Sequence, residues 1–317
     1  MNLKNLKNLK KQVLALLAGL AVSATASAGP FVVGDVFASI GGGKVDVYSK
    51  TGAFKATLDT TLGGFTTGSA FDSFGNFYVT AISVNKVSKF DANGVLVNAS
   101  WTTGLGANES LVFDKAGNAY IGNAGATKIL KVDANGVALK TFTVASNTDW
   151  IDLAADQTTL VYSDESSTLR RWNVGTDTPL PDFAVQAGAN YAKRIRPNGD
   201  LMVANSSGNA YRFDAAGTLV QTYAAGIGSI FALNLDPDGK SFWTGATGGN
   251  TIEQIDIFSG AVLQKWNTQG GQLFGLSVLG EIKVATNVPE PETYAMMLLG
   301  LGVMGFVARR KQQQAAA

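Results

Sequence analysis

Two stretches, FDSFGNFYVT (71–80) and FDKAGNAYIG (113–122), are close copies of each other that start 42 residues apart. Weaker copies of the same pattern appear as IRPNGDLMVA (195–204), LDPDGKSFWT (235–244) and LSVLGEIKVA (276–285). The turn position of this pattern recurs every 40 to 42 residues, at Gly34, Gly75, Gly117, Gln157, Gly199, Gly239 and Gly280. A fixed period of this length is typical of architectures built from stacked repeats.

A second hairpin pattern lies within the period, as in KVSKFDANGVLVNASW (86–101) and KILKVDANGVALKTFTV (128–144). The dipeptides Asn93-Gly94 and Asn135-Gly136 favour tight hairpin turns, because both residue types tolerate positive φ. Each period thus predicts four short antiparallel strands, which is the pattern of a β-propeller blade. A pair of β-sandwiches is the alternative all-β fold, but it would not predict so regular a period.

The strand pattern favours six blades over seven. Six blades use the strands best if the ring closes by pairing residues 273–279 with the N-terminal hairpin. Residues 35–40 and 281–286 both fit the second strand of a blade, and a seventh blade is possible if Phe31 to Val33 forms an inner strand.

Composition excludes several kinds of chemistry. The chain contains no cysteine and no histidine, so thiol nucleophiles, disulfides, Ser-His-Asp triads and His-ligated zinc are all excluded. Residues 29–288 carry 18 basic and 22 acidic side chains, a net charge of −4. This balance predicts no nucleic-acid partner.

Residues 1–28 have the three parts of a secretory signal. Lysines come first, an apolar stretch covers residues 13–22, and Ala26-Ser27-Ala28 fits the small-x-small cleavage pattern. We therefore expect a signal helix that is removed by cleavage after Ala28, and a propeller domain that covers residues 29–288.

The sequence of the C-terminal region predicts a single transmembrane helix. Residues 293–308 are uncharged and largely apolar, and Arg309, Arg310 and Lys311 follow at once. A stretch of 16 residues is slightly shorter than the roughly 17 to 25 that span a bilayer. The basic cluster would stay cytoplasmic, which would leave the propeller on the outer side of the inner membrane.

The same region resembles the PEP-CTERM sorting signal. Val288-Pro289-Glu290-Pro291-Glu292, the apolar segment and the basic cluster follow in the order of that signal, over residues 289–317. The resemblance implies that exosortase, a membrane enzyme of Gram-negative bacteria, recognises Pro289, Glu290 and Pro291, and that Arg309 and Arg310 act as the stop. The protein would be anchored transiently and then reach the cell surface or the extracellular space. A plain tail anchor is the alternative.

The repeats themselves resemble the NHL and gluconolactonase-like propellers. In propellers, the loops that lead into the inner strands gather at one end of the central channel, where ligands usually bind. Carboxylate and amide oxygens in these loops suit Ca²⁺ or another divalent cation. The candidate ligands are Asn108, Glu109, Asn123, Asp149, Asp164 and Asn205.

We expect a non-enzymatic surface protein that binds an extracellular partner, either an exopolysaccharide or a surface protein. The alternative, which the second resemblance implies, is a divalent-metal-dependent extracellular hydrolase of the gluconolactonase type. Four of the tryptophans, at 150, 172, 243 and 266, are expected in the core, whereas Trp101 is expected to be exposed.

Overall fold

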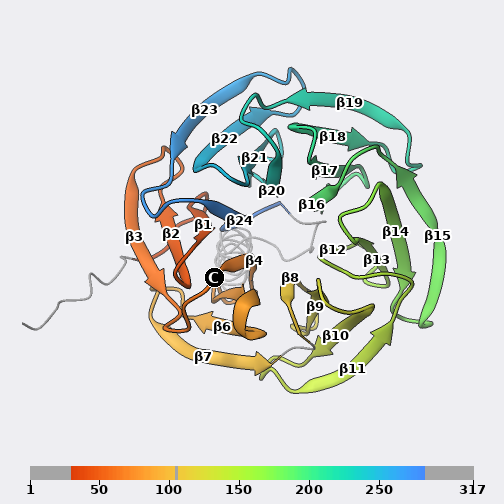
Figure 1. The fold of residues 1–317 in the computed structure, drawn as a ribbon, viewed down its shortest axis with the longest axis horizontal. Helices are drawn as coiled ribbons and strands as arrows, with labels where there is room; N and C mark the ends of the chain where they lie inside the picture. The colour runs from red at the N-terminus through yellow and green to blue at the C-terminus, as the bar shows by residue number, and fades with distance from the viewer. Residues whose placement is uncertain (1–29, 104–105, 283–317) are drawn as a thin grey trace, which may run out of the picture.

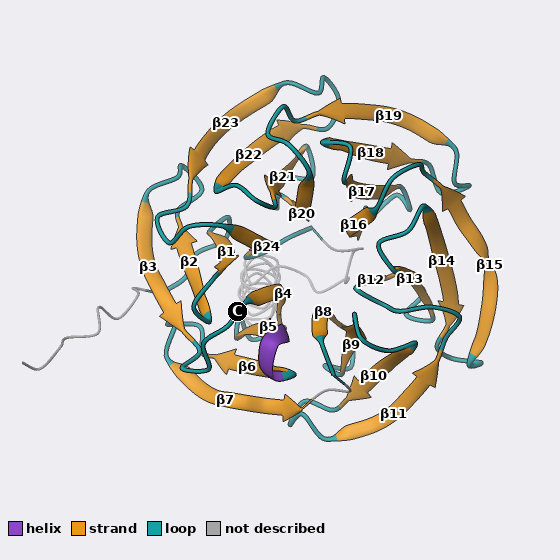
Figure 2. Cartoon of the chain, viewed as in Figure 1, coloured by secondary structure: helices purple, strands orange, loops and turns teal. Residues whose placement is uncertain are grey.

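The computed structural model describes residues 30–103 and 106–282, and this part of the chain forms a six-bladed β-propeller. Its 24 strands make six four-stranded antiparallel sheets arranged around a central channel (Figure 1). One short 3₁₀ helix, η1 (Ile82–Val84), is the only helix among the described residues (Figure 2). The all-β prediction and the six-blade prediction are both confirmed.

Each blade contains four strands that follow one another from the channel to the outer edge. Blades 1 to 3 are formed by β24 (Leu273–Val278), β1 (Val36–Ile40), β2 (Lys44–Tyr48) and β3 (Phe54–Asp59); β4 (Thr66–Phe71), β5 (Phe77–Ala81), β6 (Lys86–Phe90) and β7 (Leu96–Thr103); and β8 (Asn108–Phe113), β9 (Ala119–Asn123), β10 (Lys128–Val132) and β11 (Ala138–Thr143). Blades 4 to 6 are formed by β12 (Trp150–Leu153), β13 (Thr159–Ser163), β14 (Thr168–Asn173) and β15 (Thr178–Val185); β16 (Asn190–Ile195), β17 (Leu201–Asn205), β18 (Asn209–Phe213) and β19 (Leu219–Ala224); and β20 (Ile230–Leu235), β21 (Ser241–Ala246), β22 (Thr251–Asp256) and β23 (Val262–Asn267).

The ring closes through blade 1, whose inner strand comes from the C-terminal side of the domain. Strand β24 pairs antiparallel with β1, from Val36 opposite Val278 to Ile40 opposite Leu273. The alternative of a seventh blade is not realised, because Phe31 to Val33 do not form a strand. Phe31 instead packs edge-on against Phe37, and its N–H donates to the carbonyl of Ala92.

The turns that the sequence predicted are present. The Asp133 carboxylate accepts hydrogen bonds from the backbone N–H groups of Asn135 and Val137, and Gly136 has a φ of 80°. The same arrangement recurs at Asp91, where Gly94 also has a φ of 80°. The positive φ at the last position of such a turn explains the repeated glycine, whereas Asn93 and Asn135 do not have positive φ.

Apolar side chains fill the spaces between neighbouring blades. Trp150, Trp172 and Trp243 are buried as expected, and Trp266 is partly buried against the same core. The prediction that Trp101 is exposed is wrong, because only 7% of it is accessible. Its ring lies 4.7 Å from that of Tyr78 in the same blade. Its Nε1–H donates to the carbonyl of Ala134 in blade 3, so it fills the space between blades 2 and 3. The position of Trp101 at the end of an outer strand was not enough to predict its burial.

The propeller has two distinct faces. We call the end with the connections into the inner strands, such as residues 145–149, the loop face, and the end with the tight turns, such as residues 72–76 and 91–94, the turn face. Both ends of the described chain lie at the turn face. Phe31 bonds to Ala92 in a turn of blade 2, and Ile282 faces Gly239 in a turn of blade 6.

The two terminal segments of the chain lie outside the described residues. These segments hold the signal with Ala26 and Ala28, the sorting motif, the expected transmembrane helix and most of the expected strand 281–286; Glu281 and Ile282, its first residues, are not in a strand. Within residues 30–103 and 106–282, no helix is long and apolar enough to cross a membrane.

Candidate functional site

The inner strands share an irregularity where they begin at the loop face. In five of the six sheets the pairing between the inner strand and its neighbour shifts within the first residues of the inner strand. In blades 3, 6 and 1, the residue left without a partner is Glu109, Phe231 and Phe274, respectively. A β-bulge bends a strand and re-aims the side chain of its unpaired residue.

The second position of the inner-strand pattern therefore forms a ring at the loop face, which we call the channel mouth. Its six members, in order from blade 2 round to blade 1, are Thr67, Glu109, Asp149, Tyr191, Phe231 and Phe274. Two adjacent blades contribute carboxylates and the next three contribute aromatic rings. The channel mouth is thus acidic on one side and aromatic on the other.

The acidic side consists of two carboxyls that are nearly inaccessible. Glu109 is 6% exposed and Asp149 is 5% exposed. Burial, reinforced by the negative charge of Asp149, holds the pKa of Glu109 well above its usual range. Burial, followed by the charge of Glu165, raises the pKa of Asp149 to about 7. Both carboxyls therefore retain protons to a much higher pH than ordinary surface acids.

A buried lysine lies beneath these acids. Lys193 is fully buried, and its Nζ donates to the carbonyl oxygens of Trp150 and Tyr191, both at 3.0 Å, and to Ser163 Oγ at 2.6 Å. Burial lowers the pKa of Lys193 to about 7, although the charge of Asp149 opposes the shift. The three acceptors match the three donors of an ammonium group.

The aromatic side brings together blades that are not neighbours. The Trp150 ring of blade 4 lies 5.0 Å from the Phe231 ring of blade 6 in an edge-on arrangement, and Tyr191 of blade 5 lies 4.8 Å from the same Phe231 ring. Blades 4 and 6 are not neighbours in the ring, so side chains from both can meet only near the central channel. Trp150 is 4% exposed, and its Nε1–H has no hydrogen-bond partner among the described residues.

Three of the other four predicted ligands are engaged by residues of their own blades. The Asn123 Oδ1 atom accepts from the N–H of Gly125 at 2.9 Å. The Asn205 amide donates to Asn190 Oδ1 at 2.8 Å and accepts from Ser207 at the same distance. The pKa of Asp164 is lowered despite burial, because Ser166 and Arg170 stabilise its charge. Asn108, at the start of β8, is buried with both amide atoms unpartnered among the described residues.

The structure thus brings Glu109 and Asp149 together, but with partners that were not predicted from the sequence. Lys193, Glu165 and Trp150 were missed as site residues. A position-by-position comparison of the inner strands could have revealed Lys193, because the corresponding position is occupied elsewhere by Ser69, Leu111, Ile151, Leu233 and Leu276. A lysine at a position so often apolar is a signal of a special environment.

A divalent cation fits this site poorly. Within the described chain, no three or more Asp or Glu side chains converge closely enough to hold a metal ion. The charge of Lys193 also acts on both Glu109 and Asp149. A metal ion bound to these carboxylates would have to overcome repulsion from a buried ammonium group.

Solved structures of other proteins share this propeller architecture. A chain in the structure described as "Crystal structure of Nidogen/Laminin Complex" matches with a TM-score of 0.67 and 14% identity, over 78% of this chain and 98% of that one. "Streptogramin B lyase structure" matches with a TM-score of 0.50 and 16% identity, over 65% of this chain and 70% of that one. The body is a propeller similar to those in these two structures, and the likeness extends to the fold alone.

The C-terminal region matches a protein family of its own. Residues 287–311 match the family described as the PEP-CTERM protein-sorting motif. The chain carries this motif directly after its propeller, which indicates an exported protein that exosortase processes and that is sorted to the cell surface or the extracellular space.

Proposed function

We propose that this protein is a non-enzymatic binding module of the cell surface, and that its channel mouth binds an extracellular polysaccharide. The observation that supports the proposal is the division of the channel mouth into an acidic side, with Glu109 and Asp149, and an aromatic side, with Tyr191, Phe231 and Phe274. A sugar ring presents both kinds of surface, since its hydroxyl groups are polar and its C–H faces are apolar.

The chemistry of each side suits one part of a sugar. Aromatic faces pack against apolar C–H surfaces, and carboxylates accept hydrogen bonds from hydroxyl groups. The unpartnered Nε1–H of Trp150 supplies a donor for a ring or hydroxyl oxygen. Ligand sites commonly combine an apolar lining with a few convergent polar groups of this kind.

The orientation of the domain is consistent with this role. The chain leaves the described domain at the turn face, where Ile282 faces Gly239. A tail that anchors the protein transiently in the inner membrane would therefore extend from the face opposite the channel mouth. The binding site would point away from the membrane while the protein is anchored.

A metal-dependent hydrolase of the gluconolactonase type has weaker support. Such an enzyme would need a set of oxygen ligands around a divalent cation. The two best candidate ligands are Glu109 and Asp149, and the charge of the buried Lys193 already acts on both carboxyls. The proposal therefore assigns these carboxyls to ligand binding.

A binding experiment with matched variants tests the proposal. The full-length exported protein would be titrated with purified exopolysaccharide of the producing strain, alongside Phe231→Ala, Glu109→Gln and the remote exposed control Lys140→Met. We expect saturable binding that falls at least tenfold in the first two variants and is unchanged in the control. Unaltered binding by both site variants, or release of new reducing ends by the wild-type protein, would overturn the proposal.

A further inference from the structure

A three-residue arrangement recurs on the turn-face side of several blades, and blade 3 shows it most clearly. Tyr120 on β9 lies opposite Lys131 on β10. The Lys131 ammonium lies 4.7 Å from the centre of the Tyr120 ring, donates to its hydroxyl at 2.8 Å, and forms an ion pair at 3.0 Å with Asp114. An aromatic ring on the second strand, a carboxylate that follows the inner strand and a cation on the third strand of the blade thus pack as one unit.

Blade 2 repeats the full arrangement, and blade 6 repeats the ring and the carboxylate, with Gln254 in place of the cation. In blade 2, the Tyr78 hydroxyl donates to Asp72 at 3.0 Å, and Lys89 lies 5.2 Å from the ring centre. In blade 6, the ring is a tryptophan, whose Nε1–H donates to the corresponding carboxylate of Asp236 at 2.9 Å. The aromatic ring and the carboxylate therefore occur together in three of the six blades.

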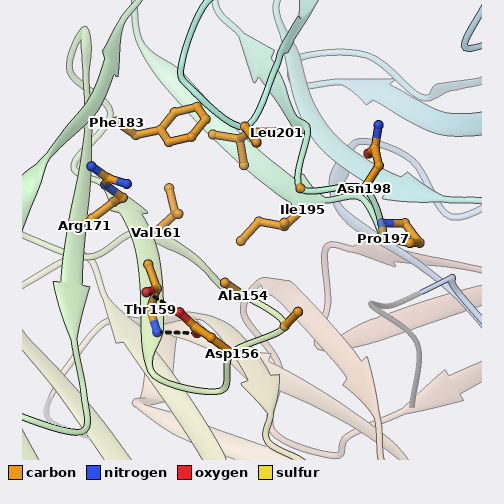
Figure 3. Close-up of a pocket in the computed structure, with 13 residues that line it drawn as sticks. Ala154, Asp156, Thr159, Val161, Arg171, Phe183, Ile195, Pro197, Asn198 and Leu201 are labelled. Atoms are coloured by element: carbon orange, nitrogen blue, oxygen red, sulfur yellow. Dashed lines mark hydrogen bonds between the residues drawn. The ribbon is translucent and has the colours of Figure 1, made fainter. Parts of the chain in front are cut away.

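Blade 4 keeps the cation but lacks the other two parts. Val161 lies opposite Arg171 in the register that pairs the tyrosines with their lysines. Ala154 stands where blades 2, 3 and 6 have their aspartate, directly after the inner strand. Ala154, Val161 and Arg171 all line one cavity of about 420 Å³ between blades 4 and 5 (Figure 3). The cavity thus lies where the ring and the carboxylate are missing.

Apart from Asp156, Thr159 and Asn198, the other side chains that line the cavity are apolar. Phe183, Ile195 and Leu201 line the cavity, whose volume lies in the ordinary range for small-molecule sites (Figure 3). Arg171 Nε donates to the carbonyl of Pro181 at 2.8 Å, which fixes the side chain. The Arg171 guanidinium lies 5.9 Å from the centre of the Phe183 ring. It forms no salt bridge with any residue that the structure describes, so it has no carboxylate partner.

We propose that the cavity between blades 4 and 5 binds a small aromatic carboxylate. The ring of the ligand takes the place of the missing tyrosine ring against Val161 and Phe183. Its carboxylate takes the place of the missing aspartate and pairs with Arg171, whose planar guanidinium matches carboxylate geometry. This site is separate from the channel mouth and does not depend on the function proposed for it.

One acidic side chain also lines the cavity, and its carboxylate is already engaged. Asp156 accepts hydrogen bonds from the backbone of Thr158 and Thr159 and from Thr159 Oγ1 at 2.6–2.8 Å. The same turn in blade 6 is held by Asp238, two residues after the aspartate that binds the ring. Asp156 is therefore the turn-forming residue, and we expect Asp156→Asn to strengthen binding of an anionic ligand modestly.

The test uses 4-hydroxybenzoate as the probe, with isothermal titration and ligand-observed NMR on the full-length exported protein. Phenol lacks the carboxylate and cyclohexanecarboxylate lacks the aromatic ring, so each tests one half of the proposal. Val161→Tyr should fill the cavity, and Arg171→Gln should remove the cation while retaining a polar side chain. Val185→Tyr, at an exposed position of the same blade, is the control for the tyrosine substitution.

We expect saturable binding of 4-hydroxybenzoate at one site, at least tenfold tighter than binding of phenol or cyclohexanecarboxylate. Val161→Tyr and Arg171→Gln should each weaken it at least tenfold, and Val185→Tyr should leave it unchanged. Failure of the wild-type protein to bind 4-hydroxybenzoate, equal binding of all three probes, or full binding by a folded Val161→Tyr or Arg171→Gln variant would overturn the proposal.

Discussion

Arg194 on the inner strand of blade 5 binds both carboxylate oxygens of Glu281, which follows the last strand of the ring. Its Nε atom lies 2.9 Å from Oε1 and 3.2 Å from Oε2. Glu281 Oε1 also accepts from the N–H of Leu235 in blade 6 at 2.9 Å. Because β24 belongs to blade 1, this carboxylate links three blades at the turn face.

The first prediction concerns this link. Glu281→Ala should lower the free energy of unfolding by about 3 kcal/mol, because it leaves a largely buried guanidinium without its counter-charge. Chemical denaturation monitored by tryptophan fluorescence measures the change. Lys140→Met is the matched control, since the Lys140–Asp177 pair is exposed and should contribute less than about 1 kcal/mol. Equal effects of the two substitutions would contradict the link.

The second prediction concerns the close approach of two inner strands. A Cβ atom at Gly275 would lie 2.0 Å from the carbonyl oxygen of Thr67 in the next blade. Gly275→Ala should therefore destabilise the propeller by about 2–3 kcal/mol, because the backbone of blade 2 has to move. At Gly41 a Cβ atom would have no neighbour within 4 Å, so Gly41→Ala should change stability by less than about 0.5 kcal/mol. Thermal unfolding of both variants measures these changes in stability.

The third prediction is a stability profile with opposite slopes on either side of neutral pH. The folded state raises the pKa of Asp149 to about 7, so it binds the proton more tightly than the unfolded chain does, and stability falls as pH rises from about 4 to 7. The folded state lowers the pKa of Lys193 to about 7, so stability rises as pH increases from about 7 to 10. Each effect is on the order of 4 kcal/mol.

Two substitutions separate these contributions. Asp149→Asn should make the acidic branch of the profile less steep, with the raised pKa of Glu109 leaving part of the slope, and Lys193→Met should flatten the alkaline branch. Urea unfolding at a series of pH values measures both. If the alkaline slope of Lys193→Met matched that of the wild-type protein, the lysine would not be the group that titrates.

The fourth prediction concerns processing at the sorting motif. The native surface protein should end close to Pro289-Glu290-Pro291, and replacement of these three residues by alanine should leave the full chain in the membrane fraction. Mass spectrometry of both fractions provides the measurement. Recovery of Arg309 and Arg310 in the wild-type surface protein would instead show a plain tail anchor.

The periodic features of the fold were predictable because they depend on local sequence. The Asp133 turn and its Gly136 are set by residues within five positions of one another, and the same signals repeat at Asp91 in blade 2 and Asp214 in blade 5. The ring closure was also predictable, since one strand was left unpaired at each end of the domain. Local signals of this kind survive in the sequence because each turn and hairpin forms from adjacent residues.

The candidate site was predicted only in part, because it depends on contacts between blades. Glu109 and Asp149 were recognisable as polar residues in loops that lead into inner strands. Lys193 was not, because its burial results from acceptors at Trp150 and Ser163, which lie 30 or more residues away. The burial of Trp101 was missed for the same reason, since its neighbour Ala134 belongs to the next blade.

The position of β24 has a mechanical consequence. This strand is the last of the ring, lies at the channel, and is hydrogen-bonded to a neighbour along one edge only, that of β1. Tension transmitted through the tail during membrane anchorage would pull along β24 and load its hydrogen bonds to β1 in shear, so that they resist together rather than break one at a time. The Glu281–Arg194 pair lies between the tail and this strand and would take the force first. A ring closed in this way suits a domain that has to remain folded while it is tethered.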